Sequence, residues 1–494
     1  MNRAISMGAM WMGVMWMGAM WVGLSGCGPK NVPPQTRTYT EMPSPLAPRP
    51  FQLPAVVAGE LSNGIQIAVV ENHEVPLVYV RLVSENGAWT DPADRPGLAS
   101  ATVDMLNEGA AGKTADQISR ELRALASELT SGSGLDGATV NLKTLKENLT
   151  PSLDLMAQVT LQPDFPEAEW SIIRANRIQT LKAVPQDPRQ IARRAWSRMM
   201  YGEAYAGNLT TIDSYEAMTR AEMQTWYADH FVAEDLTFLV GGDITLEEIQ
   251  PLLEARFGEA FQATGGETTA AVTPDAAPVD AGTIYLVDKP GATQSLIRMG
   301  QFVGERTAED ATALELANMA IGGQFTSRIN LNLREDKGWT YGASSWISYN
   351  YLPGVWNVYT SVQTPYTADA ITEMWGELEG ALGETPLTQG ELAAARGDVL
   401  GSWPVRFENP GYLLDRTVDV QRYALPKDWL SSYPDRIRAV SLADARAALQ
   451  ANINPEALVV LVIGDVDVVR PALEGLGWPI VEMNPDGTPV APND

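Results

Sequence analysis

The feature that most constrains the fold of this chain is a phrase that occurs twice. Leu236–Asp243 reads Leu-Thr-Phe-Leu-Val-Gly-Gly-Asp, and Leu458–Asp465, 222 positions later, reads Leu-Val-Val-Leu-Val-Ile-Gly-Asp. An amphipathic helical pattern follows each copy, at Leu246–Phe257 and at Val468–Leu476. Self-similarity at a fixed distance is typical of repeated structural units, so the chain is expected to contain two homologous halves of about 220 residues.

Both halves begin with strand patterns and continue with helical patterns. In the first half an Asn63-Gly64 turn between two apolar runs predicts a hairpin, and a strand is expected at 76–85. Helices are expected to begin near Pro96 and to lie at 116–128, 147–160, 166–183, 188–200 and 213–230. In the second half strands are expected at 283–287, 293–303, 339–349 and 354–363, with helices at 307–320 and 326–336. This order predicts an α+β fold of two homologous domains, each a largely antiparallel sheet with helices on one face.

Composition sets the expected domain limits. We expect a leader at 1–26, a proline-rich tether at 27–54, an N-terminal domain at 55–262, a linker at 263–282, a C-terminal domain at 283–484 and a polar tail at 485–494. The tether and the linker have almost no large apolar residues, so neither segment can bury a core.

The leader has the composition of a secretory signal: Arg3 comes first, and an uncharged run follows. It ends in Leu24-Ser25-Gly26-Cys27, which resembles the bacterial lipobox, in which the cysteine is acylated and becomes the new N-terminus. That resemblance implies a lipid anchor on Cys27, and Gly28 after the cysteine favours the outer membrane, with the protein facing the periplasm. The alternative is an uncleaved transmembrane anchor.

The charged and metal-binding residues exclude several function classes. The chain has 35 Lys and Arg against 61 Asp and Glu, a net charge of −26, which argues against nucleic-acid binding. Its two histidines, His73 and His230, lie too far apart to form any local two-histidine motif, and each is expected to be a surface or capping residue. The single cysteine, Cys27, rules out an intramolecular disulfide.

Several stretches together resemble the pitrilysin/insulinase-type zinc metallopeptidases, in particular the branch similar to the mitochondrial processing peptidase. They are Asn63-Gly64, Arg95-Pro-Gly-Leu98, Leu236–Asp243 and, most specifically, the phrase Leu333-Arg334-Glu-Asp-Lys-Gly338-Trp-Thr-Tyr341-Gly342. The resemblance spans roughly residues 55–480 and implies that family's paired-domain fold.

The family's metal motif is missing from this sequence. Active members carry His-x-x-Glu-His on the helix after Pro-Gly-Leu-Ala, and here the three positions are Ser100, Val103 and Asp104. The family's further ligand, a glutamate, would fall near Leu181, and no carboxylate occurs between Trp170 and Gln186. The resemblance therefore implies a chain with no metal site and no catalytic residue of its own, inactive as a peptidase when alone.

A second set of family residues is kept. In two-subunit members, one subunit supplies the zinc helix, and the other supplies an Arg and a Tyr that reach the substrate; Arg334 and Tyr341 match their spacing. A guanidinium and a phenol are hydrogen-bond donors, which can stabilise an oxyanion. Gly338 is expected to end the helix in a left-handed cap, placing Tyr341 on the next strand. The alternative is an Arg334–Glu335 ion pair and a half-buried Tyr341.

Gly322-Gly323-Gln324 resembles the family's Gly-Gly loop. Exposed backbone amides there would pair with an extended peptide as an added strand. A plain helix-to-helix turn is an equally open interpretation.

These expectations converge on one function and one alternative. The expected function is that of a non-catalytic, substrate-binding and active-site-complementing subunit of a heterodimeric zinc metalloendopeptidase in the bacterial periplasm. Its partner would be a homologous subunit that carries His-x-x-Glu-His and the zinc, and its substrates would be unfolded or short peptides. The alternative is a peptide-binding or scaffold lipoprotein that acts without a peptidase partner.

Overall fold

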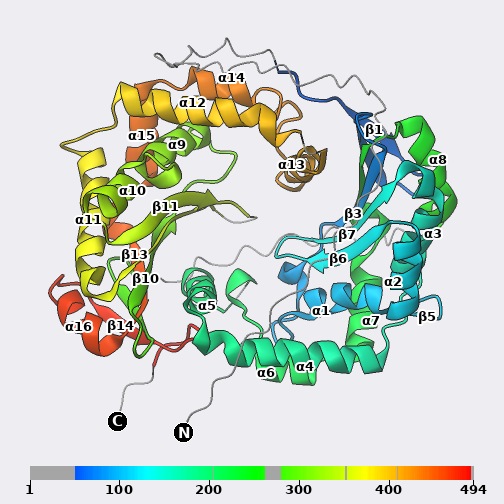
Figure 1. The fold of residues 1–494 in the computed structure, drawn as a ribbon, viewed down its shortest axis with the longest axis horizontal. Coiled ribbons are helices and arrows are strands. Elements are labelled where there is room, and N and C mark those ends of the chain that lie inside the picture. Colours follow the sequence, from blue (N-terminus) through cyan, green and yellow to red (C-terminus); the bar gives the residue numbers. More distant parts are fainter. Residues whose placement is uncertain (1–50, 204, 262–279, 351–352, 409, 491–494) are drawn as a thin grey trace, which may run out of the picture. The chain divides into compact units, whose positions relative to one another are not determined.

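Each half of the chain builds one six-stranded sheet (Figure 1), and five of the six strands correspond in order; the exception is the edge, where β1 pairs antiparallel with β2 but β14 pairs parallel with β9. The computed structural model describes residues 51–203, 205–261, 280–350, 353–408 and 410–490. The first sheet runs β1-β2-β8-β3-β7-β6, and the second runs β14-β9-β13-β10-β12-β11. Strands of the first sheet are β1 Val56–Glu60, β2 Gln66–Glu71, β3 Leu77–Ser84, β6 Glu128–Ser133, β7 Ala138–Leu145 and β8 Leu236–Gly242. Those of the second are β9 Ile284–Asp288, β10 Gln294–Phe302, β11 Thr340–Ser348, β12 Val355–Gln363, β13 Val459–Gly464 and β14 Ile480–Met483.

The repeated phrase forms a central strand in each sheet. β8 runs parallel to β2 and antiparallel to β3, and β13 runs parallel to β9 and antiparallel to β10. Every residue of β13, and all but Thr237 of β8, is buried. A strand covered on both faces needs a continuous apolar run, so the phrase recurs because both halves need the same central strand. The prediction of two homologous α+β domains is confirmed.

The predicted opening hairpin is present. β1 and β2 pair antiparallel, and Gly64 in the turn between them has φ +92°, a conformation that favours glycine. The Asn63 side-chain amide donates to the backbone carbonyls of Phe257, at 2.9 Å, and Ala260, at 2.6 Å. The turn is thereby fixed to the end of helix α8, which follows the central strand of the same sheet.

Helices cover one face of each sheet. The helices that the chain contains in its first half are α1 Leu98–Asp104, α2 Ala115–Ala124, α3 Leu149–Leu161, α4 Glu167–Ala183, α5 Pro188–Tyr201, α6 Ile212–Ala217, α7 Arg220–His230 and α8 Leu246–Phe257, of which all but α5 belong to that half's own side of the molecule. Those of the second half are α9 Ala311–Asn318, α10 Arg328–Asn330, α11 Thr367–Leu382, α12 Gln389–Arg406, α13 Pro410–Arg422, α14 Tyr433–Ala439, α15 Leu442–Asn452 and α16 Val466–Glu474. The short strands β4 Gly109–Ala110 and β5 Lys113–Thr114 form a separate ribbon.

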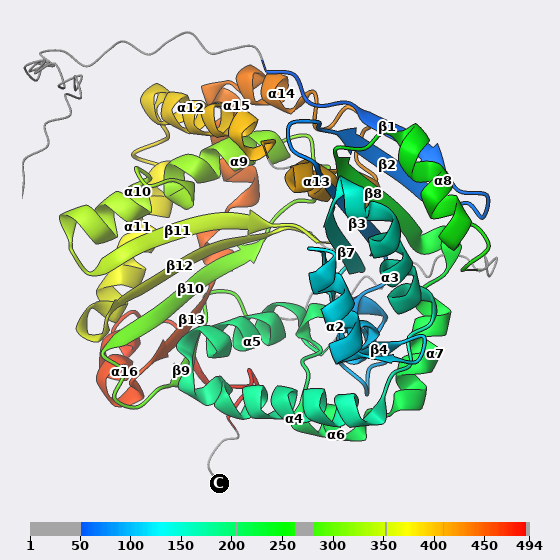
Figure 2. The ribbon, with the colours of Figure 1, turned by 45° about the vertical axis from the view of Figure 1, so that its right-hand side comes forward.

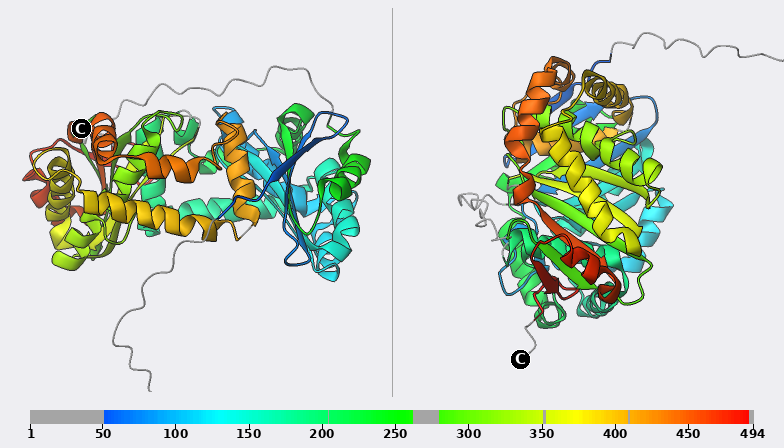
Figure 3. Two further views of the ribbon diagram at one scale, coloured as in Figure 1. Left: turned by 90° about the horizontal axis from the view of Figure 1, so that it is seen from above. Right: turned by 90° about the vertical axis from the view of Figure 1, so that its left-hand side faces the viewer.

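One helix of each half crosses to the other half and covers the second face of its sheet. Helix α5, which lies beside the second sheet in Figure 2, packs Ile191 and Trp196 against buried residues of β9, β10, β12 and β13. Helices α11 and α16 pack on the opposite face of the same sheet (Figure 3). In return, Leu413 and Leu414 of α13 pack against β2, β3 and β8 of the first sheet. The expectation of helices on one face is therefore incomplete, because each sheet is covered on its second face by the other half.

Ionic and stacking contacts accompany this exchange. Arg81 of β3 pairs with Asp415 of α13. Arg298 of β10 lies over the indole of Trp196 of α5, with its guanidinium carbon 4.4 Å from the ring centre. Residues Phe51–Asp494 form one compact unit, which is consistent with these contacts between the halves.

Three predicted helices have different limits in the structure. The helix expected at 213–230 is two helices, because the Thr219 side chain accepts from the backbone N–H of Glu222 and starts a new one. The helix expected at 307–320 begins at Ala311 and widens into a π-helical turn at Met319–Gly323. The helix expected at 326–336 is regular only over Arg328–Asn330 and becomes π-helical at Leu331–Asp336.

The leader and nearly all of the tether, with Cys27, lie outside the described residues, as does most of the 263–282 linker. Among the helices that are described, none combines the length and the apolar character needed to cross a bilayer.

Candidate functional site

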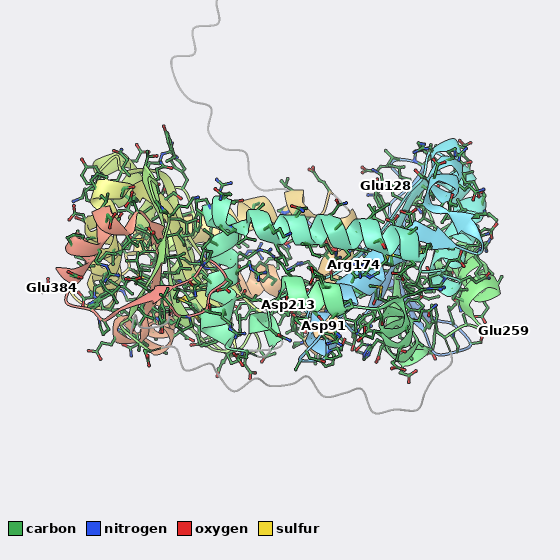
Figure 4. The ribbon with its side chains drawn as sticks, turned by 90° about the horizontal axis from the view of Figure 1, so that it is seen from below. Asp91, Glu128, Arg174, Asp213, Glu259 and Glu384 are labelled. Atoms are coloured by element: carbon green, nitrogen blue, oxygen red, sulfur yellow. The ribbon has the colours of Figure 1, made fainter. Side chains whose placement is uncertain are left out.

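Helix α1 carries the positions of the missing metal motif. It begins after Gly97, which has φ +91°, and buries Leu98, Ala99, Ala101 and Val103. The carboxylate of Asp91, a residue labelled in Figure 4, accepts the backbone N–H of Gly97 at 2.6 Å and that of Ala99 at 2.7 Å. Burial raises the pKa of Asp91 to about 7, against the opposing effect of these hydrogen bonds. Asp91 thus anchors the start of the helix.

A guanidinium lies where the resemblance places a metal. Arg177 extends from α4 to α1, and its Nη2 donates to the backbone carbonyl and to the hydroxyl of Ser100, both at 3.1 Å. The same nitrogen pairs with the carboxylate of Asp104. Its Nη1 donates to the Tyr215 hydroxyl at 3.2 Å. Two of the three motif positions therefore contact one fixed cation, whose side chain is 16% exposed.

The donor set at these positions does not fit zinc. Ser100 and Asp104 offer oxygen atoms only, and both already contact Arg177. A zinc site needs three or four protein ligands, commonly with nitrogen or sulfur among them, and a second cation beside Arg177 would be repelled. Val103, at the position of the family's glutamate, is fully buried. Among the described residues, no group of three or more His, Cys, Asp or Glu side chains could hold a metal ion.

The two histidines have local partners of their own. His73 lies at the surface with its Nδ1 2.6 Å from Asp243 Oδ1, and the hydrogen bond to Asp243, followed by that to Glu71, raises its pKa. His230 ends α7 with its ring 4.9 Å from that of Trp226, and burial lowers its pKa. The surface role expected from the sequence is found for His73, whereas the side chain of His230 is half-buried against Trp226.

Arg334 lies in the π-helical turn Leu331–Asp336, with a side chain 39% exposed. Its Nε lies 3.2 Å from Glu335 Oε1, as in the alternative that the sequence leaves open. Its guanidinium carbon is 4.6 Å from the ring centre of Phe325, which is itself 59% exposed. Phe325 thus supports the guanidinium at the surface, a role that the sequence did not suggest.

Tyr341 is 91% exposed, so the half-buried tyrosine of the alternative is not observed. Gly338 has φ +67° and ends the preceding turn, as predicted, so Tyr341 falls at the start of strand β11. The ladder between β11 and β12 is irregular between Thr340 and Ala343, and β11 is the edge strand of its sheet. Within the described residues, no hydrogen bond or ion pair links Tyr341 with Arg334, and both side chains reach solvent.

The Gly322-Gly323-Gln324 segment packs more closely than expected. Gly322 is buried, and a Cβ on it would lie 2.4 Å from Ser345 Oγ, so glycine permits the close approach of the π-helical turn Met319–Gly323 to β11. Its amide is not available to a peptide. Gly323 and Gln324 are half-buried at the end of the π-helical turn. Peptide binding by these two residues stays a prediction.

The role of Arg177 was not predicted from the sequence, because the family resemblance points to a carboxylate near Leu181 and not to a basic residue. Arg177 lies on the same helix, one turn earlier. A basic residue so close to the place of a missing ligand is the signal that could have identified it.

Comparisons with known proteins agree with this geometry. Residues 66–212 match the family model described as insulinase, peptidase family M16, and residues 217–397 match the peptidase M16 inactive domain. The two matches thus extend from the first half into the second, as far as residue 397.

Relatives and solved structures extend the match. The chain is 23% identical over 344 residues to an uncharacterized zinc protease of Streptomyces coelicolor, covering 67% of this chain and 74% of that one. It is 20% identical over 413 residues to the non-peptidase homolog YmxG of Helicobacter pylori, covering 81% and 92%. A peptidase M16 inactive domain from Pseudomonas fluorescens has the same fold, with a TM-score of 0.76, 22% identity and coverage of 83% and 98%. The chain belongs to the insulinase-type peptidase family M16.

Proposed function

We propose that this chain is the non-catalytic, active-site-complementing subunit of a heterodimeric M16 metalloendopeptidase that acts on peptides in the bacterial periplasm. Its partner is a homologous chain that carries His-x-x-Glu-His and binds the zinc. The observation that carries the proposal is the contrast between the halves. In the first half the guanidinium of Arg177, from α4, contacts the metal-motif helix α1, and the second half presents two hydrogen-bond donors to solvent.

The contacts of Arg177 support an inactive first half. Its interactions with Ser100 and Asp104 satisfy the only polar groups at the motif positions. The buried Val103 offers no base to activate water. An M16 chain with this site needs another subunit to supply the hydrolytic chemistry.

Arg334 and Tyr341 supply what such a subunit would add. The guanidinium of Arg334, in the π-helical turn, and the phenol of Tyr341, on the edge strand β11, both reach solvent and can donate to a peptide carbonyl, or to the oxyanion that forms during attack on it. Neither group cleaves a peptide bond by itself. The proposal therefore assigns substrate binding and charge stabilisation to this chain and bond cleavage to its partner.

The cellular location in this proposal rests on the sequence. The segment ending in Cys27 resembles a lipobox, and more than one acyl chain gives a stable membrane anchor. The protein would then be held at the outer membrane and face the periplasm, where unfolded or short peptides are its substrates.

Reconstitution tests the proposal. The chain is mixed with a homologous His-x-x-Glu-His protein from the same genome, and hydrolysis of an unfolded protein such as reduced casein is followed. The mixture is expected to cleave and each chain alone to be inactive. Tyr341→Phe or Arg334→Gln should lower the rate of the mixture by roughly 10²–10³, the usual cost of removing an oxyanion donor. Arg120→Gln, a change at an exposed arginine of α2, is the matched control and should leave the rate unchanged. Full activity of both site variants would contradict the assigned roles.

The stand-alone peptide-binding or scaffold protein remains the second candidate, and one observation favours it. Arg334 is paired with Glu335 and stacked on Phe325, so its charge is already compensated on its own surface. Under this candidate the chain binds peptides without a catalytic partner. A homologous zinc-motif gene beside the gene for this chain favours the first proposal, and its absence favours the second.

A further inference from the structure

A cavity of about 530 Å³ lies in the second half, away from the exposed Arg334 and Tyr341 side chains. Its walls come from α9, from the far end of β11, and from α12, α13 and the segment that leads into α14. Helix α13 also packs on the first sheet, so the cavity borders the contact between the two halves.

The position of this cavity follows from the repeat. Helix α9 is the first helix of the second half and packs on α15 and β11, as α1, the first helix of its half, packs on α7 and β6. The α9 residues Glu315 and Asn318 line the cavity. The second half therefore has an open cavity against the helix that corresponds to the metal-motif helix, whereas Arg177 fills that region in the first half.

Arginines dominate the charge around the cavity. Arg306 and Arg416 share one carboxylate, that of Asp419, with distances of 3.4 Å and 2.7 Å. Arg406 has no carboxylate within 4.0 Å in the described part of the chain, and it donates to the Tyr412 hydroxyl at 3.5 Å and to Ser402 Oγ at 3.3 Å. The cavity lining thus contains more guanidinium groups than carboxylates.

The remaining acid of the wall does not restore the balance. Glu315 accepts a hydrogen bond from the Tyr433 hydroxyl at 2.5 Å, and burial raises the pKa of Glu315, which favours its neutral form. The lining keeps a net positive charge.

Two buried donors of the same wall have no partner. The Nε1 of Trp403 and the Nε of Arg416 are buried and form no hydrogen bond within the described residues. Trp403 is only 6% exposed. Because neither atom is accessible to solvent, a ligand in the cavity does not reach either one, and Arg406 is the donor that such a ligand can contact.

Aromatic rings form much of the remaining wall, among them Trp346, Tyr349 and Trp429. Rings favour a ligand with a flat or apolar body, and the excess of guanidinium groups favours an anionic end. A carboxylate suits this lining better than a phosphate, because a second negative charge would be repelled by Asp419.

We propose that this cavity binds an organic carboxylate with an aromatic or apolar body, with the guanidinium of Arg406 donating to the carboxylate. Such a group can be a small free acid or the C-terminal carboxylate of a peptide. This inference goes beyond the proposed function and needs no partner subunit, so the chain alone can test it.

Isothermal titration calorimetry on the full mature chain provides the test. The ligands are 3-phenylpropionate, its neutral analogue 3-phenylpropionamide, the tripeptide Ala-Ala-Phe with a free carboxylate, the same tripeptide as its C-terminal amide, and inorganic phosphate. Each carboxylate ligand should bind with 1:1 stoichiometry and at least about tenfold more tightly than its amide. A tighter tripeptide identifies peptide ends as the source, and a tighter phenylpropionate identifies a small acid. Both results support the proposal.

Variants locate the binding. Arg406→Gln should weaken carboxylate binding by about 10- to 100-fold, while Arg438→Gln, a change at an exposed arginine of α14, should leave it unchanged. Arg406 is an exposed residue whose replacement is compatible with folding, and thermal denaturation checks that each variant is folded. Equal binding of acid and amide, phosphate binding as tight as that of the acids, no binding at all, or unchanged affinity in folded Arg406→Gln would overturn the proposal.

Discussion

The Nη2 of Arg177 pairs with the carboxylate of Asp104 and joins helices α4 and α1 across the metal-motif position. A built-in cation there has two consequences. It satisfies the polar groups that replace the metal ligands, and it opposes the entry of a divalent ion by charge repulsion. The loss of the metal motif is therefore accompanied by a compensating contact from a second helix.

Restoring ligands on α1 alone should not restore a metal site. We expect the double variant Ser100→His/Asp104→His to bind zinc weakly because Arg177 stays beside the two imidazoles. Adding Arg177→Glu replaces the cation with a ligand and should tighten zinc binding by at least about 100-fold. Zinc affinity measured by competition with a chromogenic chelator checks this, and equal affinities of the double and triple variants would contradict the role of Arg177.

Asp91 should make the stability of the protein depend on pH. Its folded pKa of about 7 lies above its ordinary value of 3.8, so between these two values the native state holds more protons than the unfolded state. The free energy of unfolding then falls as pH rises through this window, by up to about 1.4 kcal/mol per pH unit. Asp91→Asn cannot ionise and should lack this pH dependence. In urea unfolding, the free energy of unfolding of the variant should therefore rise relative to that of the wild type from pH 4 to pH 7. A pH-independent difference would contradict the raised pKa.

Arg298 should contribute to the packing of α5 on the second sheet. Its guanidinium lies 4.4 Å from the ring centre of Trp196 and 5.6 Å from that of Trp346, and it donates to Asn357 Oδ1 at 2.7 Å. Arg298→Lys keeps the charge but loses the planar group, and we expect a loss of about 1–2 kcal/mol in urea unfolding. Arg120→Lys, at the exposed end of an ion pair on α2, serves as the control and should change stability by less than about 0.5 kcal/mol. Equal losses of stability from the two changes would show that Arg298 does not contribute to the packing of α5.

Cys27 should hold the protein at the membrane. Cys27→Ser removes the thiol that would be acylated, so the protein is expected to move from the membrane fraction to the soluble periplasmic fraction with its fold unchanged. Immunoblots of the fractions check this. Continued membrane retention of the variant would indicate an uncleaved anchor instead.

The parts of the fold that depend on local patterns could be predicted from the sequence. The repeated phrase marks the central strands β8 and β13 because a strand buried on both faces must be apolar throughout. Asn63-Gly64 marks the first hairpin, and Gly338 marks the end of the turn before β11, because both glycines take a positive φ. These signals lie within a few residues of the structure that they determine.

Contacts between distant segments could not be predicted in this way. The crossing of α5 and α13 to the opposite sheets depends on how the halves meet, and the amphipathic pattern of a helix does not name the sheet that it covers. The role of Arg177 could not be predicted because it depends on the space beside Ser100 and Asp104, on a different helix. The contact between Phe325 and Arg334 could not be predicted because it depends on the π-helical turn, which brings the guanidinium over the ring.

The central claim is that this chain completes the active site of a homologous zinc peptidase. Its most direct test is purification of the native complex from its own membranes under mild detergent, with the partners identified by mass spectrometry and their ratio measured. We expect to recover one homologous protein with His-x-x-Glu-His in a 1:1 ratio, with zinc bound to that protein. Recovery of the chain alone, or with an unrelated assembly, would rule out the complementing-subunit role and favour the stand-alone binding protein.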